Sequence, residues 1–528
     1  MKSIHSKNYL IIISLCLVSF GIYQAFNYYF THGMLGVPLD DTWIHFRFAE
    51  NFAKEFNFTF NPGEPTAGTT SPLWVVVSGL VSFISPMFIL NSVILSGLFF
   101  ILCCIFIYKI SVTVFFDSDV LDFDLDFSPL YLSLLVALLT VMAGRLEWAA
   151  MSGMETTMFI FFTLLGVYYH IKDVQNQKIS LIPSILFALS TASRPEGLML
   201  FGLYLFDAWT FSFTIKRVLK TTLDLIAGVI IFVMIAGGYF LFSYYTSGNI
   251  LPNTFRGQGG NFEFLPNLEY LRINFVLFLR DNPITCVLYL FSFIFYFANI
   301  RKFFSKLRSL NLIYLWVILL PIASSIFVPN WRHHGRYLMP LLPFINLISV
   351  YAIVVILNKY KEKGSLKLLH NTKFLTTLLL FFSLIYYVVY GIALGKNSDN
   401  INSQQVKLAH WVKENVSPND VIALNDIGAI TFVSKNRIVD MAGLVTPQIL
   451  DYRKYRLEDN LDSMITLLKN NDVKYLIIYD HWFEPFLKRH GQYFEYLLSA
   501  KLEVNTICGG DEMKVYKVNF YRKENENN

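Results

Sequence analysis

Two adjacent carboxylates, Asp40 and Asp41, begin a polar run within residues 37–73, which lie between two long apolar segments. A carboxylate within hydrogen-bond reach of a hydroxyl can take its proton while the oxygen attacks, which is general-base catalysis. Two neighbouring carboxylates beside a low-dielectric surface also repel each other, so we expect their pKa values to separate. The structural alternative is that Asp40 caps a helix beginning near Thr42, a frequent use of Asp before a helical run.

Basic side chains in two stretches are suited to binding a phosphate, because the planar fork of Arg contacts two phosphate oxygens and keeps its proton when desolvated. One cluster precedes an apolar run, and the other residue lies in the first polar stretch. These basic residues are Arg332, His333, Arg336 and Arg47. The alternative for the cluster beside Trp331 is that it anchors the end of a membrane helix among lipid headgroups.

Further polar residues occur where apolar segments end, which is a costly location for charge unless the groups pair or line a cavity. Arg194 and Glu196 flank Pro195, so they either pair with each other or with Glu155, or they contact a substrate. The residues that we expect to line a substrate cavity are Glu155, Arg194, Glu196, His334, Asn253 and Trp43.

Neither the cysteines nor the histidines specify a metal centre. Four of the five cysteines fall inside apolar segments and Cys508 stands alone, so we expect no disulfide framework and no spaced ligand set. His333 and His334 with nearby carboxylates leave a divalent metal open, but their spacing does not require one. We therefore assign no metal ligand and no certain cofactor.

The composition indicates that membrane helices position these residues. Of the 528 residues, 54% are hydrophobic, 17% aromatic and only 15% charged, so a soluble chain would need an implausibly large core. The net charge is only +5, and the basic residues fall in short clusters between apolar runs, so we expect no nucleic-acid partner. We predict a polytopic α-helical membrane protein in a lipid bilayer.

A helix that crosses a bilayer needs about 20 apolar residues. The runs that approach this length predict about eleven transmembrane helices. The first, 9–30, lacks small cleavage-site residues, so we expect an uncleaved anchor with a cytoplasmic N-terminus. The others are 90–115, 130–147, 154–171, 180–194, 197–213, 222–245, 283–300, 311–329, 338–358 and 374–394. Basic clusters at 172–178, 216–220, 301–308 and 359–367 mark every second connection, which predicts that these loops are cytoplasmic. The helix expected at 72–85 would lie along the outer leaflet, although three crossings between 72 and 116 would fit equally.

The outward loops then collect most of the unusual polar residues, and the end of the chain changes character. We predict a transmembrane catalytic domain at 1–395, with its first outer loop at about 31–89, and an α/β domain outside the membrane at 396–528. Alternating helix and strand patterns support the second domain. Its expected helices are 401–415, 461–470 and 486–500, and its expected strands are 421–424, 437–441, 473–479 and 513–518.

Several short motifs follow one another along most of the chain. They are Asp40-Asp41-Thr-Trp-Ile-His-Phe-Arg47, Phe60-Asn61-Pro62-Gly63-Glu64, Gly68-Thr-Thr-Ser71-Pro72-Leu73-Trp74, Ser152-Gly153-Met154-Glu155-Thr156, Arg194-Pro195-Glu196-Gly197, Pro252-Asn253-Thr254, Arg332-His333 with Arg336, Asn425-Asp426-Ile427-Gly428, and Asp440-Met-Ala-Gly443-Leu444. This ordered set resembles membrane glycosyltransferases of the GT-C superfamily, and it is most similar to the group containing mycobacterial terminal arabinofuranosyltransferases. The motifs are specific for the superfamily and say little about the sugar.

The resemblance implies an inverting glycosyltransferase of a bacterial inner membrane. It would take a sugar from a polyprenyl-phosphate donor and pass it to a hydroxyl of a cell-envelope glycan or glycolipid on the periplasmic face. With such a donor, we expect the phosphate to be bound by Arg332, His333, Arg336 and Arg47. In enzymes of this kind an acidic residue of the first outer loop acts as the base. By position that role falls on Asp40, with Asp41 as the alternative base or as the group that orients it.

Two other classes of protein compete with the enzyme. A transporter or flippase of a lipid-linked saccharide would also place polar groups in a membrane cavity. However, no internal repeat is visible, and the polar residues are expected on one side of the membrane instead of at its midplane. A membrane-anchored binding protein that uses only the C-terminal region would leave the polar first loop unexplained.

Overall fold

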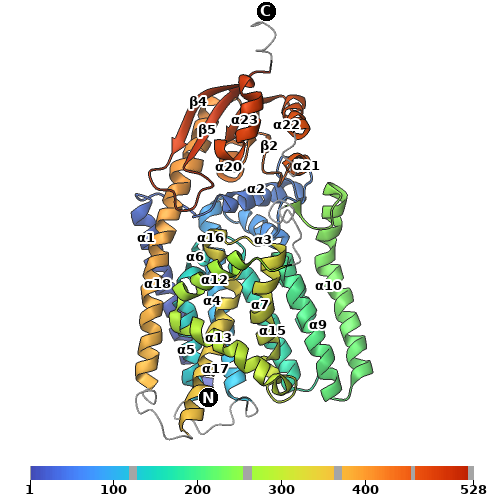
Figure 1. Ribbon diagram of the computed structural model, residues 1–528, viewed down its shortest axis with the longest axis vertical. Coiled ribbons are helices and arrows are strands. Elements are labelled where there is room, and N and C mark those ends of the chain that lie inside the picture. The colour runs from blue at the N-terminus through green and yellow to red at the C-terminus, as the bar shows by residue number, and fades with distance from the viewer. Residues whose placement is uncertain are drawn as a thin grey trace, which may run out of the picture.

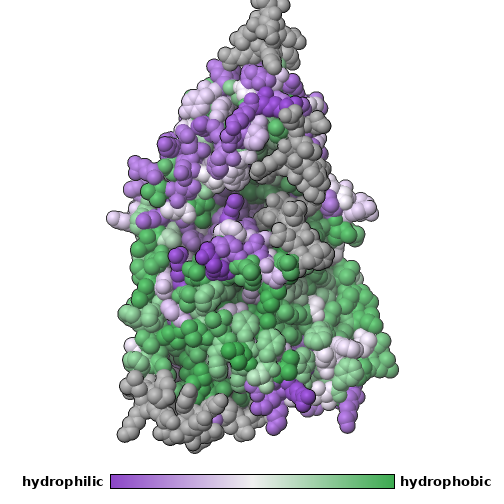
Figure 2. Space-filling model, viewed as in Figure 1, coloured by the Kyte–Doolittle hydropathy of each residue, from purple (hydrophilic) through white to green (hydrophobic). Residues whose placement is uncertain are grey.

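The computed structural model describes residues 2–117, 120, 128–253, 265–361, 372–453 and 458–520. It has two layers along its longest axis: a bundle of helices, and a smaller domain with a β-sheet that lies on one end of the bundle (Figure 1). On the face shown in Figure 2, a broad apolar surface covers the bundle beneath a mostly hydrophilic sheet domain.

The bundle consists of helices of very different lengths. Its elements are α1 (Lys2–Phe30), α4 (Phe88–Phe115), α5 (Pro129–Val141), α6 (Gly144–Met151), α7 (Thr156–Gln175), α8 (Ile182–Ser193), α9 (Glu196–Thr214), α10 (Val218–Ser247), α12 (Leu268–Asp281), α13 (Pro283–Ala298), α14 (Ile300–Phe303), α15 (Arg308–Phe327), α16 (Arg332–Gly335), η1 (Met339–Leu341), α17 (Leu342–Lys361) and α18 (Thr372–Ile401). Within the described residues, six helices are long and apolar enough to cross a membrane, or seven if the bent pair α5 and α6 is one span.

These helices make the protein a multi-pass membrane protein. Large apolar side chains on the outside of the bundle, such as Leu219, Met234 and Ile294, are 76%, 69% and 70% exposed, which is costly in water and favourable in lipid. Each predicted apolar run is helical, but the run at 130–147, expected as one helix, is the pair α5 and α6, which is bent by 55° at the break. The number of eleven crossings stays a prediction. The helices α8 and α13 have only 12 and 16 residues, fewer than the roughly 20 that span the hydrocarbon core.

Two helices of the first outer loop lie between the bundle and the sheet domain. Figure 1 shows α2 (Asp40–Glu55) lying across the end of the bundle, and α3 (Pro72–Ser82) is the predicted apolar helix. The first turn of α2 carries Asp40 and Asp41 and its last turn carries Lys54, an arrangement that complements the helix dipole. The helix ends at Phe56, which has a left-handed backbone with φ of 49°.

The C-terminal region is an α/β domain, as predicted. Its elements are η2 (Asn402–Val406, one π-helical turn), α19 (Lys407–Asn415), β1 (Val421–Leu424), α20 (Gly428–Ser434), β2 (Ile438–Asp440), α21 (Gln448–Arg453), α22 (Glu458–Asn470), β3 (Val473–Ile478), η3 (Asp480–Trp482), α23 (Glu484–His490), η4 (Gly491–Tyr493), β4 (Phe494–Lys501) and β5 (Glu512–Val518). The strand order is β2-β1-β3-β5-β4; β2, β1 and β3 are parallel, and β5 is antiparallel to β3 and β4.

One predicted element of this domain is wrong. The helix expected at 486–500 ends at His490, and Phe494–Lys501 is a strand paired with β5. The helical spacing of apolar residues was overridden by tertiary pairing, since β5 offers an edge and Tyr496 lies opposite Tyr516. The division predicted at residues 395 and 396 falls within α18, which runs from the bundle toward the domain without interruption.

A shared apolar core fixes the sheet domain to the first outer loop. Ile44 and Phe48 of α2 lie in the same buried cluster as Ile427 and Ile430 of the sheet domain. Phe48 is fully buried, and burying an aromatic side chain of this kind contributes about 1.5–3 kcal/mol. The start of α2 is therefore held from both sides, by the bundle below and the domain above.

Candidate active site

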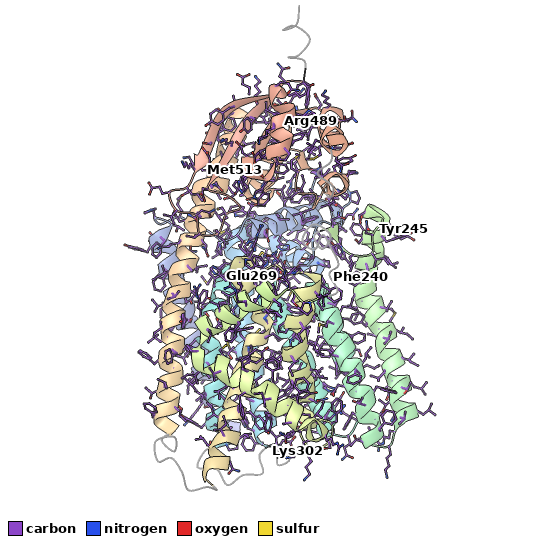
Figure 3. All side chains as sticks on the ribbon, viewed as in Figure 1. Phe240, Tyr245, Glu269, Lys302, Arg489 and Met513 are labelled. Atoms are coloured by element: carbon purple, nitrogen blue, oxygen red, sulfur yellow. The ribbon has the colours of Figure 1, made fainter. Side chains whose placement is uncertain are left out.

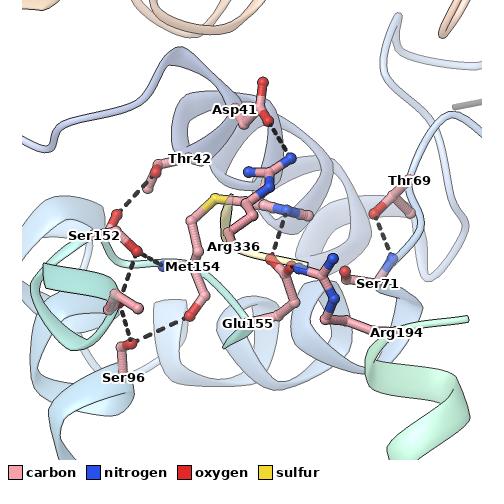
Figure 4. Close-up of polar contacts among 12 residues, drawn as sticks. Asp41, Thr42, Thr69, Ser71, Ser96, Ser152, Met154, Glu155, Arg194 and Arg336 are labelled. Carbon is pink, nitrogen blue, oxygen red and sulfur yellow. Dashed lines mark hydrogen bonds and ion pairs between the residues drawn. The ribbon is translucent and has the colours of Figure 1, made fainter. Parts of the chain in front are cut away.

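Asp41 and Arg336 form an ion pair where the bundle meets the sheet domain. An Arg336 Nη atom donates to Asp41 Oδ2 at 2.7 Å, although the residues are 295 positions apart. The Arg336 side chain is buried, whereas that of Asp41 is 36% exposed. Figure 4 shows the pair above Glu155 and Arg194.

A left-handed turn carries Arg336 to this position. His333, His334 and Gly335 have φ values of 56°, 58° and 66°, so the chain reverses within α16. Each such non-glycine residue costs roughly 1–2 kcal/mol, and a strained backbone of this kind is often found at functional sites. Hydrogen bonding between His334 Nε2 and Asn397 Oδ1, 2.9 Å apart, helps to hold the turn.

Glu155 lies at the centre of a second charge network. Arg194 Nη1 donates to Glu155 Oε1 at 2.8 Å, and His45 Nε2 lies 3.3 Å from Glu155 Oε2. Arg194 also pairs with Glu196 at 2.7 Å, which is the pairing alternative that the sequence left open. Because Arg194 and Glu155 are both buried, each charge depends on the other for compensation.

The two networks line one small cavity of about 60 Å³. Its charged lining comes from four parts of the chain: Asp41 and His45 of α2, Glu155 before α7, Arg194 after α8, and Arg336 after the left-handed turn. The Nε and Nη1 atoms of Arg336 are buried without a hydrogen-bond partner in the described structure. Unpaired buried guanidinium donors are unfavourable, so the site is suited to an anion that accepts from them.

The carboxylates of the cavity are held in the charged form. Burial raises the pKa of Asp41, but Arg336 and then His333 outweigh this effect and leave the pKa lowered. Burial also raises the pKa of Glu155, yet His45 and Arg194 together hold it at about 2. The cavity therefore presents two carboxylates and two guanidinium groups, all ionised at neutral pH.

Asp40 occupies a different environment from its neighbour. Its Oδ2 accepts the N–H of Gly428 at 2.7 Å and its Oδ1 accepts that of Ala429 at 2.8 Å, both at the start of α20. A side chain at Gly428 would meet the Asp40 backbone oxygen at 2.1 Å, so only glycine permits this approach. Burial and the neighbouring Asp426 carboxylate raise the pKa of Asp40 above its usual range.

This geometry separates the two aspartates that the sequence left as alternative bases. Asp40 does not line the cavity. It also does not cap its own helix, because α2 begins at Asp40 and no side chain caps its first turn. The carboxylate instead receives the first N–H groups of a helix in the sheet domain. Asp40 therefore connects the first outer loop to that domain.

We expect Asp40→Asn to loosen the contact between α2 and α20. The amide would point an N–H donor at a backbone N–H, leaving a buried donor unpaired at a cost of about 1–3 kcal/mol. Hydrogen exchange should be faster at the amides of Gly428 and Ala429 than in the wild type. The matched control is Glu414→Gln, at an exposed position of α19. Protection at these two amides equal to that of the wild type would contradict the connecting role.

Several other residues expected at the site lie outside the cavity. Arg47 donates to the carbonyl of Phe60 at 3.2 Å and pairs with Glu50, and Arg332 is exposed beside Trp482. The remaining members of this group are His333, His334, Glu196, Asn253 and Trp43, none of which lines the cavity. Trp43 packs against aromatic rings of α2 and α20. Asn253 donates to the carbonyl of Leu444 at 3.1 Å, so it joins the bundle to the sheet domain beside the cavity.

Reasoning from the sequence missed His45, Thr69, Thr70 and Tyr337 in the lining. His45 was within reach of such reasoning, because it follows Asp41 by four positions and so lies on the same helix face. Within the described parts of the chain, no group of three or more His, Cys, Asp or Glu residues is arranged to hold a metal ion.

Comparisons with known proteins place this arrangement in a known fold. A family model described as a domain of unknown function, DUF8728, matches residues 399–518. No curated protein matches the chain by sequence. Among solved structures, ArnT from Cupriavidus metallidurans bound to undecaprenyl phosphate aligns at a TM-score of 0.61 and 12% identity, covering 96% of this chain and 97% of that chain.

A second similar structure is AglB, an archaeal oligosaccharyltransferase from Archaeoglobus fulgidus in complex with an inhibitory peptide and a dolichol-phosphate. It aligns at a TM-score of 0.56 and 13% identity, covering 92% of this chain and 73% of that chain. The arabinofuranosyltransferase AftD from Mycobacteria aligns at a TM-score of only 0.42, with 41% of that chain covered. The helical bundle and the C-terminal domain thus share the overall fold of the ArnT and AglB structures.

Proposed function

We propose that the protein is an inverting glycosyltransferase. It moves a sugar from a polyprenyl-phosphate donor to a hydroxyl of a cell-envelope glycan or glycolipid, on the periplasmic face of a bacterial inner membrane. The observation that carries this proposal is the Asp41–Arg336 pair. It places a partly exposed carboxylate and a buried guanidinium with unpaired donors in one cavity.

The two groups suit the two halves of the reaction. Asp41 takes the proton of the acceptor hydroxyl while its oxygen bonds to the anomeric carbon. The bond from that carbon to the phosphate oxygen breaks on the opposite face, and polyprenyl phosphate leaves with the electron pair. Arg336 and Arg194 neutralise the charge that develops on the phosphate. Glu155, paired with Arg194 and His45, holds these groups in place.

The same ion pair keeps the base inactive until the donor is bound. A cavity of about 60 Å³ is far smaller than the roughly 300–1,000 Å³ of sites for drug-sized ligands, so a sugar phosphate needs the cavity to open, and separation of Asp41 and Arg336 would open it. When the phosphate takes the guanidinium, Asp41 loses the positive partner that lowers its pKa. Asp41 then becomes a stronger base at the moment when the acceptor needs it.

The placement of basic residues supports an outward-facing site. Figure 3 shows Lys302 at the end of the bundle opposite the sheet domain, where Arg489 and Met513 lie. Since positively charged loops favour the cytoplasm, the sheet domain and the cavity beneath it would face the periplasm. The two well-aligned structures, ArnT with undecaprenyl phosphate and AglB with dolichol-phosphate, support a polyprenyl-phosphate donor.

A transfer assay with purified protein in detergent tests the proposal. Radiolabelled polyprenyl-phospho-sugars, with pentose or hexose headgroups, are incubated with envelope glycans extracted from cells that lack the gene. We expect label in the glycan for one donor, with release of polyprenyl phosphate. A protein that moves these donors between the leaflets of proteoliposomes but never transfers label would be a flippase, and the enzymatic proposal would be wrong.

A further inference from the structure

A second, larger cavity lies at the interface between the bundle and the sheet domain. It has a volume of about 220 Å³ and is lined by the first outer loop, the end of α10 and the loops around β2 and α21. Its polar lining includes Glu64, Thr246, Arg437, Thr446, Gln448 and Asn471. None of these residues lines the cavity that holds Asp41.

The two cavities adjoin each other along the chain. Thr66 lines the larger cavity and Gly68 the smaller, while Val445 lines the larger and Leu444 the smaller. A side chain at Gly68 would meet Leu444 and Val445 at 2.8 and 2.7 Å, so the two segments touch. The two cavities therefore share these two segments as walls.

The walls of the larger cavity are fixed in advance. Asn61 exchanges two hydrogen bonds with the backbone of Ile438, both 3.0 Å long, which attaches the first outer loop to β2. Arg437 Nε donates to Glu64 Oε1 at 2.7 Å and its Nη1 to Asn471 Oδ1 at 3.1 Å. A preformed cavity avoids the entropy cost of ordering its walls when a ligand binds.

The chemistry of the lining selects the class of ligand. Carboxylate, guanidinium, amide and hydroxyl groups match the donors and acceptors of sugar hydroxyls, whereas a polyprenyl chain needs an apolar groove. A volume of about 220 Å³ is below the roughly 300–1,000 Å³ of sites for drug-sized ligands, which suits a single sugar ring.

We propose that this cavity binds the acceptor, at the sugar unit next to the one that carries the reacting hydroxyl. The inference rests on the proposed function and deepens it, because it makes the acceptor a saccharide of at least two units. The acceptor would then pass over the contact between Gly68 and Leu444, with one unit facing Asp41 and the next beside Arg437 and Gln448.

Saturation-transfer NMR on the full-length protein in nanodiscs tests this site. The probes are methyl glycosides of pentofuranoses and hexopyranoses at millimolar concentration. Gln448→Trp fills the cavity from the exposed start of α21, and Thr246→Trp fills it independently from α10. The control is Lys413→Trp, at an exposed position of α19.

We expect at least one glycoside to give a signal with the wild type and with Lys413→Trp, and the signal to fall at least fivefold in both cavity-filling variants. No signal from any glycoside with the wild type would overturn the acceptor site, as would a signal that survives in both filled variants. These results are distinct from the transfer assay. A protein that fails to transfer any sugar but binds glycosides in a Gln448-dependent way would refute the enzyme and keep the saccharide site.

Discussion

Asp41→Asn is expected to lower the rate of sugar transfer by about 10²–10⁴-fold, the usual contribution of a general base. The amide has nearly the same shape and its oxygen can still accept from Arg336, but it cannot take the proton of the acceptor hydroxyl. Single-turnover transfer from a polyprenyl-phospho-sugar isolates the chemical step. Donor binding should be retained, since the phosphate contacts Arg336 and Arg194.

The pH dependence distinguishes the loss of a base from a structural defect. In the wild type, the rate should fall as the pH drops through the pKa of Asp41 in the donor complex, because protonated Asp41 cannot act as a base. The residual rate of Asp41→Asn should lack this dependence. Glu55→Gln, at the other end of α2, is the control and should keep the wild-type profile. Wild-type activity in a folded Asp41→Asn protein would remove Asp41 from the mechanism.

Arg336→Gln is expected to lower kcat by about 10²–10³-fold, comparable to the removal of one preorganised donor to a developing negative charge. The variant loses the charge that stabilises the leaving phosphate, and it also leaves Asp41 without its ion-pair partner. Arg336→Lys should recover only part of the rate, because Lys restores the charge without the planar fork.

Steady-state kinetics with the donor varied identify which step Arg336 serves. A loss concentrated in kcat indicates stabilisation of the departing phosphate, whereas a rise in donor KM alone would indicate ground-state binding only. Arg332→Gln is the matched control, because Arg332 lies four residues away, is exposed and does not line the cavity. Equal losses for Arg332 and Arg336 would contradict the assignment and favour a general role of this segment at the membrane surface.

Most helices of the bundle were predictable, because an apolar run specifies each of them locally. The helix α12 was not predicted, because charged residues interrupt its apolar pattern. The strand at Phe494–Lys501 was not, because its partner β5 decides its conformation and lies farther along the chain. Residue types also indicated that Asp41, Glu155, Arg194 and Arg336 are unusual, since charge beside apolar segments is expensive. Their convergence on one cavity depends on contacts between distant segments.

The difference between Asp40 and Asp41 shows where sequence reasoning stopped. Neighbours on a helix point about 100° apart, which follows from 3.6 residues per turn. One carboxylate therefore faces the sheet domain while the other faces the cavity. Which one faces which depends on the docking of Gly428 and Ala429, 388 and 389 residues away from Asp40.

A cryo-EM structure of the protein in nanodiscs with undecaprenyl phosphate would test the central proposal most directly. We expect the phosphate between Arg336 and Arg194, accepting from the Arg336 atoms that have no partner in the free protein. Asp41 should be released from Arg336 and face the space left for the acceptor. A phosphate bound away from both arginines, with the Asp41–Arg336 pair intact, would contradict the account.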